Sequence, residues 1–353
     1  MKSDGAFRKK SDNRGVMGQE KDSIVEKERQ EEVTAHARDK LYGLLRRSST
    51  LIGLFLIGLA LSLISDRFLS VENLLNILRE NSHIAILAVG MTLVVIIGEI
   101  DLSVGAVEAL ACVIVTWMMV HGRLGILSSI LITLIAGILC GMISGFFVAY
   151  FRFHSFISTL GMMGIARGLA LIFVQGASIY GLPESFRFIG QGAIGPIAIP
   201  VLIGAVVLIL AHLLLTQFPL GSHVYAVGGN IEAARLCGLN VGRVKWIALS
   251  ISGFCGSLAG VVMASRVNAG IGGLGEGDLL DTIASVIIGG TSLTGGVGTI
   301  PGTITGVLVI GVIRNGLNLL NVSSFWQMVV IGVIIICAVL VDEIRRKVQE
   351  KER

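Results

Sequence analysis

The chain has 353 residues, of which 53% are hydrophobic and only 15% are charged, and its formal net charge is +4. A soluble domain carries roughly 25% charged residues, so this composition, with a mean hydropathy of +0.83, excludes a soluble globular domain. The charges gather at the ends: residues 1–50 hold 12 Lys and Arg with 9 Asp and Glu, and residues 342–353 hold 5 and 4. We therefore predict an all-α polytopic membrane protein, and nothing in the charge pattern indicates a nucleic-acid partner.

We expect a charged cytoplasmic extension over residues 1–48, a transmembrane domain over 49–341 and a cytoplasmic tail over 342–353. A membrane-spanning helix needs about 20 mostly apolar residues. We predict ten spans, at about 49–65, 81–98, 102–120, 125–149, 155–175, 198–216, 245–264, 279–297, 300–320 and 324–341. Lys and Arg in the loops favour the side of the N-terminus, so we expect both ends of the chain inside the cell.

Two stretches of the chain are similar to each other. VIIGEIDLSVGAV (95–107) aligns without gaps on VIIGGTSLTGGVG (286–298). Transporters are often built from internal repeats, with broken helices at matching positions. Chance similarity is the other explanation, because the chain is rich in Val and Ile and has 46 glycines. Both interpretations, an internal repeat and coincidence, stay open.

Some of the glycines recur at helical spacing. Gly137, Gly141 and Gly145 lie four residues apart, as do Gly164 and Gly168. Small residues at this spacing let helix backbones approach closely in lipid. We expect both sets to serve helix packing.

The segment 98–110, GEIDLSVGAVEAL, places Glu99, Asp101 and Glu108 in the most apolar part of the chain. An ionised carboxylate inside a membrane costs roughly 3 kcal/mol even on lenient insertion scales. Asp101 or Ser103 is placed to cap the following span, which explains Asp101 without a role in transport. Glu108 lies one to two turns into that span, so we expect it to face the dimer interior, a partner helix or water.

Further polar residues occur in the last three spans. Asn315 and Asn318 lie three apart in the ninth span, Gln327 lies in the tenth, and Asp281 and Thr282 open the eighth. Hydrogen bonding between helices explains each of them, and we favour it over contact with a solute. Our candidates for a translocation pathway are Glu99, Asp101, Ser103, Glu108, Asn315 and Asn318.

The longest loop on the expected cytoplasmic side is 217–245. Within it, Asn230 suits a helix N-cap, Glu232 suits the positive end of a helix dipole, and Gly238 suits a C-terminal stop. We predict a short helix over about 231–237 that lies outside the bilayer. A capped helix in a polar loop is typical of a docking element for a partner.

Several motifs resemble the permease subunits of bacterial ABC importers, of the ribose, xylose and autoinducer type within the branched-chain amino acid and sugar permease family. The motifs are GEIDLSVGAV (98–107), VYAVGGNIEAARLCGLNVGRVK (224–245), LDTIASVIIGGTSLTGGVGTIPGTITGVLV (280–309) and NGLNLLNVSSFWQMVVIGVIIICAVLVD (315–342). They occur in the family's order and cover about residues 50–342. The resemblance therefore extends over essentially the whole membrane part.

This resemblance implies a subunit of about ten helices that pairs with a second copy, most simply as a homodimer, around a central pathway. It implies separate ABC ATPase subunits on the cytoplasmic face and an extracytoplasmic binding protein that delivers the solute. It assigns ATPase coupling to the short predicted helix, with Asn230, Glu232, Ala233, Ala234, Arg235 and Gly238. The usual family motif is G-G-I-D-L-S-V-G, so Asp101 and Ser103 match it, whereas Glu99 replaces a glycine and Glu108 replaces an apolar residue.

We predict the transmembrane subunit of an ABC importer for a sugar or sugar-like solute, in the bacterial inner membrane. The sequence has no G-x-x-x-x-G-K-[ST] phosphate loop, so ATP and Mg²⁺ belong to the partner ATPase and we expect no cofactor on this chain. Its cysteines and histidines show no catalytic or metal-binding spacing, so we expect neither enzymatic activity nor a metal site. The alternative is an ion-coupled secondary transporter that uses Glu99, Asp101 and Glu108. A non-transporting membrane scaffold is the third hypothesis.

Overall fold

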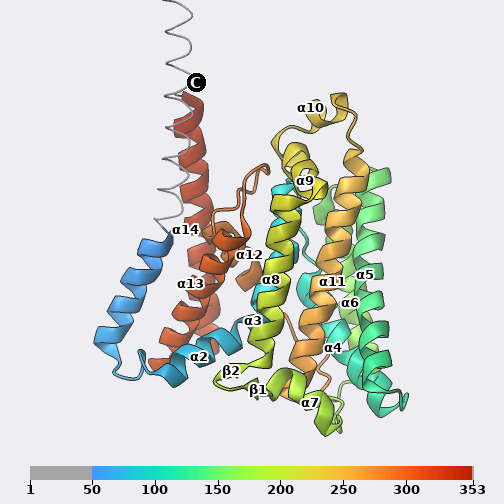
Figure 1. Ribbon diagram of the computed structural model, residues 1–353, viewed down its shortest axis with the longest axis vertical. Helices are drawn as coiled ribbons and strands as arrows, with labels where there is room; N and C mark the ends of the chain where they lie inside the picture. The colour runs from blue at the N-terminus through green and yellow to red at the C-terminus, as the bar shows by residue number, and fades with distance from the viewer. Residues whose placement is uncertain (1–49, 352–353) are drawn as a thin grey trace, which may run out of the picture. The chain divides into compact units, whose positions relative to one another are not determined.

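The computed structural model describes residues 50–351, without the side chains of residues 341, 342 and 345–351. Its first helix covers Thr50–Ile64. The elements that follow along the chain (Figure 1) are α2 (Val71–Glu80), α3 (Ser82–Ile96), α4 (Val104–Val120), α5 (Ile126–Tyr150), α6 (Ser155–Val174), α7 (Glu184–Gln191), β1 (Ala193–Ile194), β2 (Ile197–Ala198), α8 (Ile199–Gln217), α9 (Pro219–Gly229), α10 (Ile231–Leu236), α11 (Val241–Val267), α12 (Asp278–Ile288), α13 (Ile300–Leu319) and α14 (Ser324–Lys351). The predicted all-α architecture is confirmed, since the two-residue strands form the only hairpin of the described part.

The described helices differ in how well they fit a membrane. Five are long and apolar enough to cross it: α5, α6, α8, α11 and α13. The pair α2 and α3 makes a sixth candidate, bent by 43° at its break. Three shorter apolar stretches coincide with further expected spans: Thr50–Ile64, Val104–Val120 and Ser324–Leu340. The predicted break near residues 98–102 is present, but the count of ten spans and the orientation stay predictions.

The expected span over 279–297 is wrong. Helix α12 has 11 residues and ends at Ile288, and Gly290 after it adopts a positive φ of 89°. At 1.5 Å per residue the helix is about 16 Å long, roughly half the thickness of a bilayer core. A glycine-rich loop over 289–299 then leads to α13. The boundary expected at residue 341 stays a prediction: the apolar part of α14 is Ser324–Leu340, and the helix itself continues to Lys351.

Helix α3 lies at the centre of the described chain. All fifteen of its residues are buried, which is expected for a helix that is apolar on every side. It packs between α11, α8 and α12, while α4 packs between α11 and α6. These contacts place the break between α3 and α4 inside the protein.

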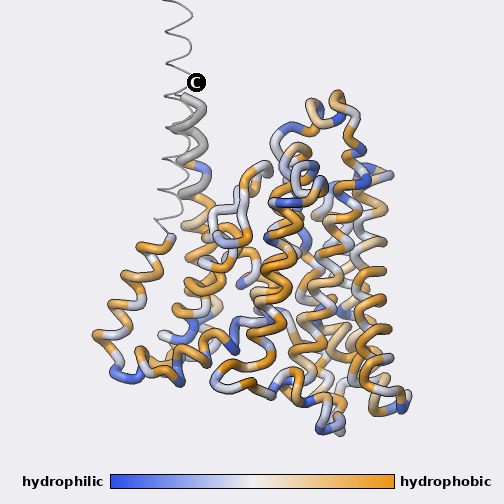
Figure 2. The backbone as a smooth tube through the Cα atoms, in the orientation of Figure 1, coloured by the Kyte–Doolittle hydropathy of each residue, from blue (hydrophilic) through white to orange (hydrophobic). Residues whose placement is uncertain are grey.

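Helices α5, α6 and α8 form the periphery. Only 22–28% of the apolar window of each is buried within the chain. Their exposed leucine, isoleucine and phenylalanine side chains would be unfavourable in water and suit contact with lipid or another subunit. Figure 2 shows hydrophobic residues along the helices and hydrophilic residues gathered toward their ends.

The two glycine patterns have different surroundings. Gly137, Gly141 and Gly145 of α5 face α11, and a methyl group at Gly141 would overlap the carbonyl oxygen of Leu249. Nothing lies within 4 Å of the corresponding positions at Gly164 and Gly168 of α6. The expected packing role is confirmed within this chain for α5, whereas α6 leaves its glycines uncovered.

Candidate functional site

Helix α10 is the short helix predicted in the loop over residues 217–245. Asn230 caps it, because its side-chain oxygen accepts a hydrogen bond of 2.9 Å from the backbone N–H of Ala233. Glu232 lies in the first turn and forms an ion pair of 2.9 Å with Arg235. Gly238 follows the helix with a φ of +82°, a left-handed conformation that glycine adopts without strain. Local sequence signals therefore define both ends of α10.

Helix α10 presents an apolar surface away from the rest of the chain. Leu236 is 89% exposed, and Ile231 is also exposed. Ala233 is exposed, whereas Ala234 is buried against the chain. Of the two alanines predicted to meet a partner, Ala233 alone is available for contact. An exposed leucine at the tip of a small helix is a suitable anchor for another protein.

The helix before α10 was not expected from the sequence. Residues 219–229 form α9, which begins with Pro219 at its first turn, a position where proline is favoured because its missing N–H is not needed. Helix α11 likewise begins at Val241 rather than near residue 245, with Asn240 as its N-cap. Figure 1 shows α9 and α10 together at the end of the protein opposite α7 and the hairpin.

Helix α9 contacts both breaks in the membrane domain. The backbone N–H of Gly296, in the loop after α12, donates to the carbonyl of Ile96 at the end of α3 (2.8 Å). The hydroxyl of Tyr225 on α9 donates to the carbonyl of Gly298 (2.7 Å). Gly228 approaches so closely that a methyl group there would overlap the carbonyl oxygen of Ile96. We call this meeting of α9 with residues 96–98 and 295–298 the coupling junction.

The two similar stretches of the sequence differ in local structure. Helix α3 ends at Ile96 and α4 begins within the first stretch, whereas α12 ends at Ile288 and α13 begins after the second stretch. Gly98 has a φ of +77°, whereas Gly289, which aligns with it, has a φ of −62°. The two non-helical segments meet at the coupling junction. An internal repeat and coincidence therefore both stay open.

Asp101 is fully hydrogen-bonded within the break between α3 and α4. Its Oδ1 accepts from the backbone N–H and the hydroxyl of Ser103 (2.8 and 2.6 Å), and its Oδ2 accepts from the hydroxyl of Ser252 on α11 (2.7 Å). Ser103 occupies the N-cap position of α4 but makes no side-chain capping bond. Asp101 thus holds the turn before α4 and ties it to α11, rather than capping the helix in the usual way.

Helix α6 satisfies the backbone of the same break. The hydroxyl of Ser155 accepts from the N–H of Ile100, and that of Thr159 accepts from the N–H of Leu102, both at 3.1 Å. Irregular backbone at membrane depth is stable only when such partners replace water. Ser155 and Thr159 are four residues apart and therefore share one helix face, a signal that the sequence contained.

Glu99 forms an ion pair with Lys245, close to the start of α11. The two side chains are 13% and 15% exposed. The glutamate that departs from the family motif is thus neutralised by a residue from the coupling-loop motif. Sequence spacing did not reveal this pair, because 146 positions separate its members.

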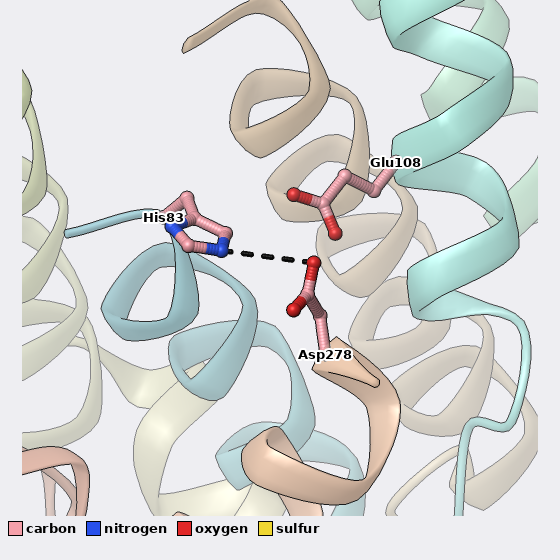
Figure 3. A group of neighbouring side chains, drawn as sticks. All are labelled: His83, Glu108 and Asp278. Carbon is pink, nitrogen blue, oxygen red and sulfur yellow. Dashed lines mark ion pairs between the residues drawn. The ribbon is translucent and has the colours of Figure 1, made fainter. Parts of the chain in front are cut away.

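Glu108 is completely buried inside the chain. Its carboxylate lies near His83, the second residue of α3, and Asp278, the first residue of α12 (Figure 3). His83 and Asp278 were not among the predicted residues. One potential ligand atom from each of the three residues lies within 4.8 Å of the others. Among the described residues, this is the one group of three or more such side chains, and it contains neither Glu99 nor Asp101.

The other predicted polar residues have partners within the described chain, on a neighbouring helix for all but Thr282, which bonds within α12. Asn315 exchanges amide hydrogen bonds with Asn73 of α2 (2.9 and 2.8 Å). Asn318 accepts from Gln327 of α14 (2.7 Å). Asp281 forms an ion pair with Arg314 (2.7 Å), and the hydroxyl of Thr282 donates to the carbonyl of Asp278 (2.6 Å). These contacts are of the structural kind that we favoured, and no contact with a solute is needed to explain them.

A buried broken span, a half-length helix beside it and a capped helix outside them define a polytopic membrane protein built for transport. The family model described as "Branched-chain amino acid transport system / permease component" matches residues 73–339. The chain belongs to this family of permease components. The resemblance that the motifs indicated is confirmed, and an ion-coupled secondary transporter is not favoured.

Curated relatives cover most of the chain. The ribose import permease protein RbsC of Haemophilus influenzae is 41% identical over 295 residues, which are 82% of this chain and 91% of that protein. RbsC of Escherichia coli K12 is 40% identical, over 84% and 94% of the two chains. The D-allose transport system permease protein AlsC of the same strain is 37% identical, over 81% and 88%. No solved structure gives a significant match.

Proposed function

We propose that this chain is the transmembrane subunit of an ATP-driven importer that passes a sugar or a sugar-like solute across the bacterial inner membrane. The matched relatives are permeases for ribose and allose, and an L-arabinose ABC transporter permease is 36% identical. In this proposal two copies of the chain pair around the solute pathway. A separate binding protein delivers the solute, and separate ATPase subunits bind and hydrolyse ATP.

The observation that carries the proposal is the connection between α10 and the membrane domain. Helix α10 is short, capped at Asn230 and exposed at Leu236. Helix α9, directly before it, contacts the ends of both broken segments at the coupling junction. A rigid helix that docks on an ATPase would transmit a movement through α9 to α3 and to the loop after α12.

Uptake by reconstituted vesicles tests this function. The full chain is reconstituted with candidate binding-protein and ATPase subunits from the same organism, and uptake of labelled ribose, arabinose and allose is measured with and without ATP inside. We expect ATP-dependent uptake of at least one of these sugars. Uptake that follows an ion gradient and ignores ATP would contradict the proposal.

A variant of α10 tests the coupling role separately. Leu236→Asp places a charge on the exposed anchor, so we expect weaker binding of the ATPase and reduced uptake without loss of folding. Leu236→Met is the matched control at the same position, because it keeps an apolar side chain of similar volume there and should retain uptake. Full uptake by the Leu236→Asp variant would exclude α10 as the docking element.

A further inference from the structure

Three helices bring His83, Glu108 and Asp278 to one point inside the protein. Figure 3 shows the three side chains directed toward one another from α3, α4 and α12. The Nε2 of His83 lies 3.6 Å from Oδ2 of Asp278. Gly275 packs so closely that a methyl group there would lie 3.1 Å from Oε2 of Glu108. The backbone before α12 therefore encloses the carboxylate of Glu108.

No N–H or O–H donor within the described part of the chain lies within hydrogen-bond distance of either carboxylate oxygen of Glu108, and its charged neighbours are Asp278 and Arg167. A buried charged group without a partner is strongly unfavourable. The side chain is nevertheless aimed at two other potential ligands rather than away from them. Packing alone does not explain a glutamate at a position where the family resemblance implies an apolar residue.

Nearby cations do not neutralise this cluster directly. Arg314 forms its ion pair with Asp281. Arg167 donates from Nη1 to the carbonyls of Gly272 and Leu274, at 2.8 and 2.6 Å. Among the described residues, the imidazole of His83 is therefore the one basic group that pairs directly with a carboxylate of this cluster.

The imidazole of His83 has one nitrogen directed at Asp278 and one nitrogen without a partner in the described part of the chain. Its Nδ1 is buried and has no partner among the described residues. Imidazole nitrogen is a common metal ligand, and Nε2 is the atom of His83 that faces the carboxylate of Asp278.

The geometry suits a metal ion held between the three side chains. Two ligands at about 2.1 Å from a tetrahedral metal ion lie about 3.4 Å apart, close to the 3.6 Å between His83 and Asp278. Glu108, whose ligand atom lies within 4.8 Å of the other two, completes the set with a small side-chain movement. One imidazole and two carboxylates are a mixed nitrogen and oxygen set that suits ions such as Zn²⁺ or Mn²⁺.

We propose that His83, Glu108 and Asp278 form a binding site for a divalent first-row transition-metal ion that links α3, α4 and α12. Such an ion neutralises both carboxylates. It also holds the N-terminal end of α12, the helix that is about half as long as a membrane span. The inference does not depend on which solute the protein transports.

Direct metal binding tests this inference. The untagged full chain is purified in detergent, treated with a chelator and dialysed against Zn²⁺, Mn²⁺ or Mg²⁺, and bound metal is counted by mass spectrometry. Cys237→Ser and Cys337→Ser form the background, because both thiols are exposed and would bind Zn²⁺ themselves. We expect about one Zn²⁺ or Mn²⁺ per chain and much weaker binding of Mg²⁺, which rarely selects imidazole.

Glu108→Gln and Asp278→Asn each remove one ligand charge, and we expect metal binding to weaken at least 10-fold. Glu276→Gln is the matched control, because this exposed carboxylate lies two residues from Asp278. We expect the Glu276→Gln variant to bind the metal ion as tightly as the parent protein does. X-ray absorption of the zinc-loaded parent is expected to show nitrogen and oxygen ligands. A parent that binds no metal, a sulfur-ligated ion, or equal affinities for Glu108→Gln and Glu276→Gln would each overturn the site. Should Glu108→Gln not fold, the parent's stoichiometry and ligand atoms decide the question.

Discussion

Glu99 and Lys245 join the break between α3 and α4 to the start of α11 through an ion pair that is mostly shielded from solvent. Lys245 lies nine residues after the end of α10. The pair therefore connects the broken span to the segment that follows the proposed docking helix. Helix α9 contacts the end of α3 next to this ion pair. Two separate sets of contacts therefore stabilise the coupling junction.

Removing either member of this pair is expected to destabilise the protein. Lys245→Met leaves a shielded carboxylate at Glu99, and Glu99→Gln leaves a shielded ammonium group, so each should lower the free energy of unfolding by about 1–3 kcal/mol. Combining the two changes removes both charges, so the double variant should lose less than the sum of the single changes. Denaturant titration of the purified chain in micelles measures all three, and strict additivity would show that the pair is not coupled.

Loss of the α10 cap is expected to impair coupling more than folding. Asn230→Ala removes the hydrogen bond to the N–H of Ala233 and should destabilise this helix by about 1 kcal/mol. ATP-driven uptake should fall while the thermal unfolding temperature of the whole chain changes little. Asn230→Asp keeps an acceptor at the cap and should retain uptake. Equal uptake by the alanine and aspartate variants would show that the N-cap of α10 does not contribute to transport.

Adjacent glycines of α9 offer a matched comparison. A methyl group at Gly228 overlaps the carbonyl oxygen of Ile96, whereas nothing lies within 4 Å of the same position at Gly229. Gly228→Ala should therefore push α9 off the coupling junction and cost about 1–3 kcal/mol, with a matching loss of uptake. Gly229→Ala should leave the free energy of unfolding and the rate of uptake unchanged within experimental error. Similar values for the two variants would mean that the close approach is not maintained in the membrane.

The two glycine patterns should respond differently to alanine. Gly141→Ala places a methyl group against the carbonyl of Leu249 and should destabilise the α5–α11 contact by about 1–3 kcal/mol. Gly164→Ala meets no atom of this chain within 4 Å, so the purified monomer should keep its stability. Unfolding in micelles compares the two. A destabilised monomer in the Gly164→Ala variant would contradict the described surroundings of α6.

Local sequence signals correctly predicted those parts of the fold that depend on residues close together in the sequence. Asn230 and Gly238 were sufficient to predict α10, because capping acts over a few residues. The half-length of α12 was missed, because hydropathy does not show that the apolar stretch turns into a loop after Ile288. The partners of Glu99 and Glu108 were missed for another reason. Lys245, His83 and Asp278 come from distant helices, and no spacing rule relates residues that only the tertiary fold brings together.

The short length of α12 also bears on how the protein is made. A helix of 11 residues is too short to be inserted across a bilayer by itself as it leaves the ribosome. Gly302 and Gly306 of α13 pack directly against the end of α12, at Gly289 and Ser285. We therefore expect α12 to insert together with α13, as one helical hairpin. The last fifth of the chain, from α12 onward, would then complete an interior that the earlier helices leave open.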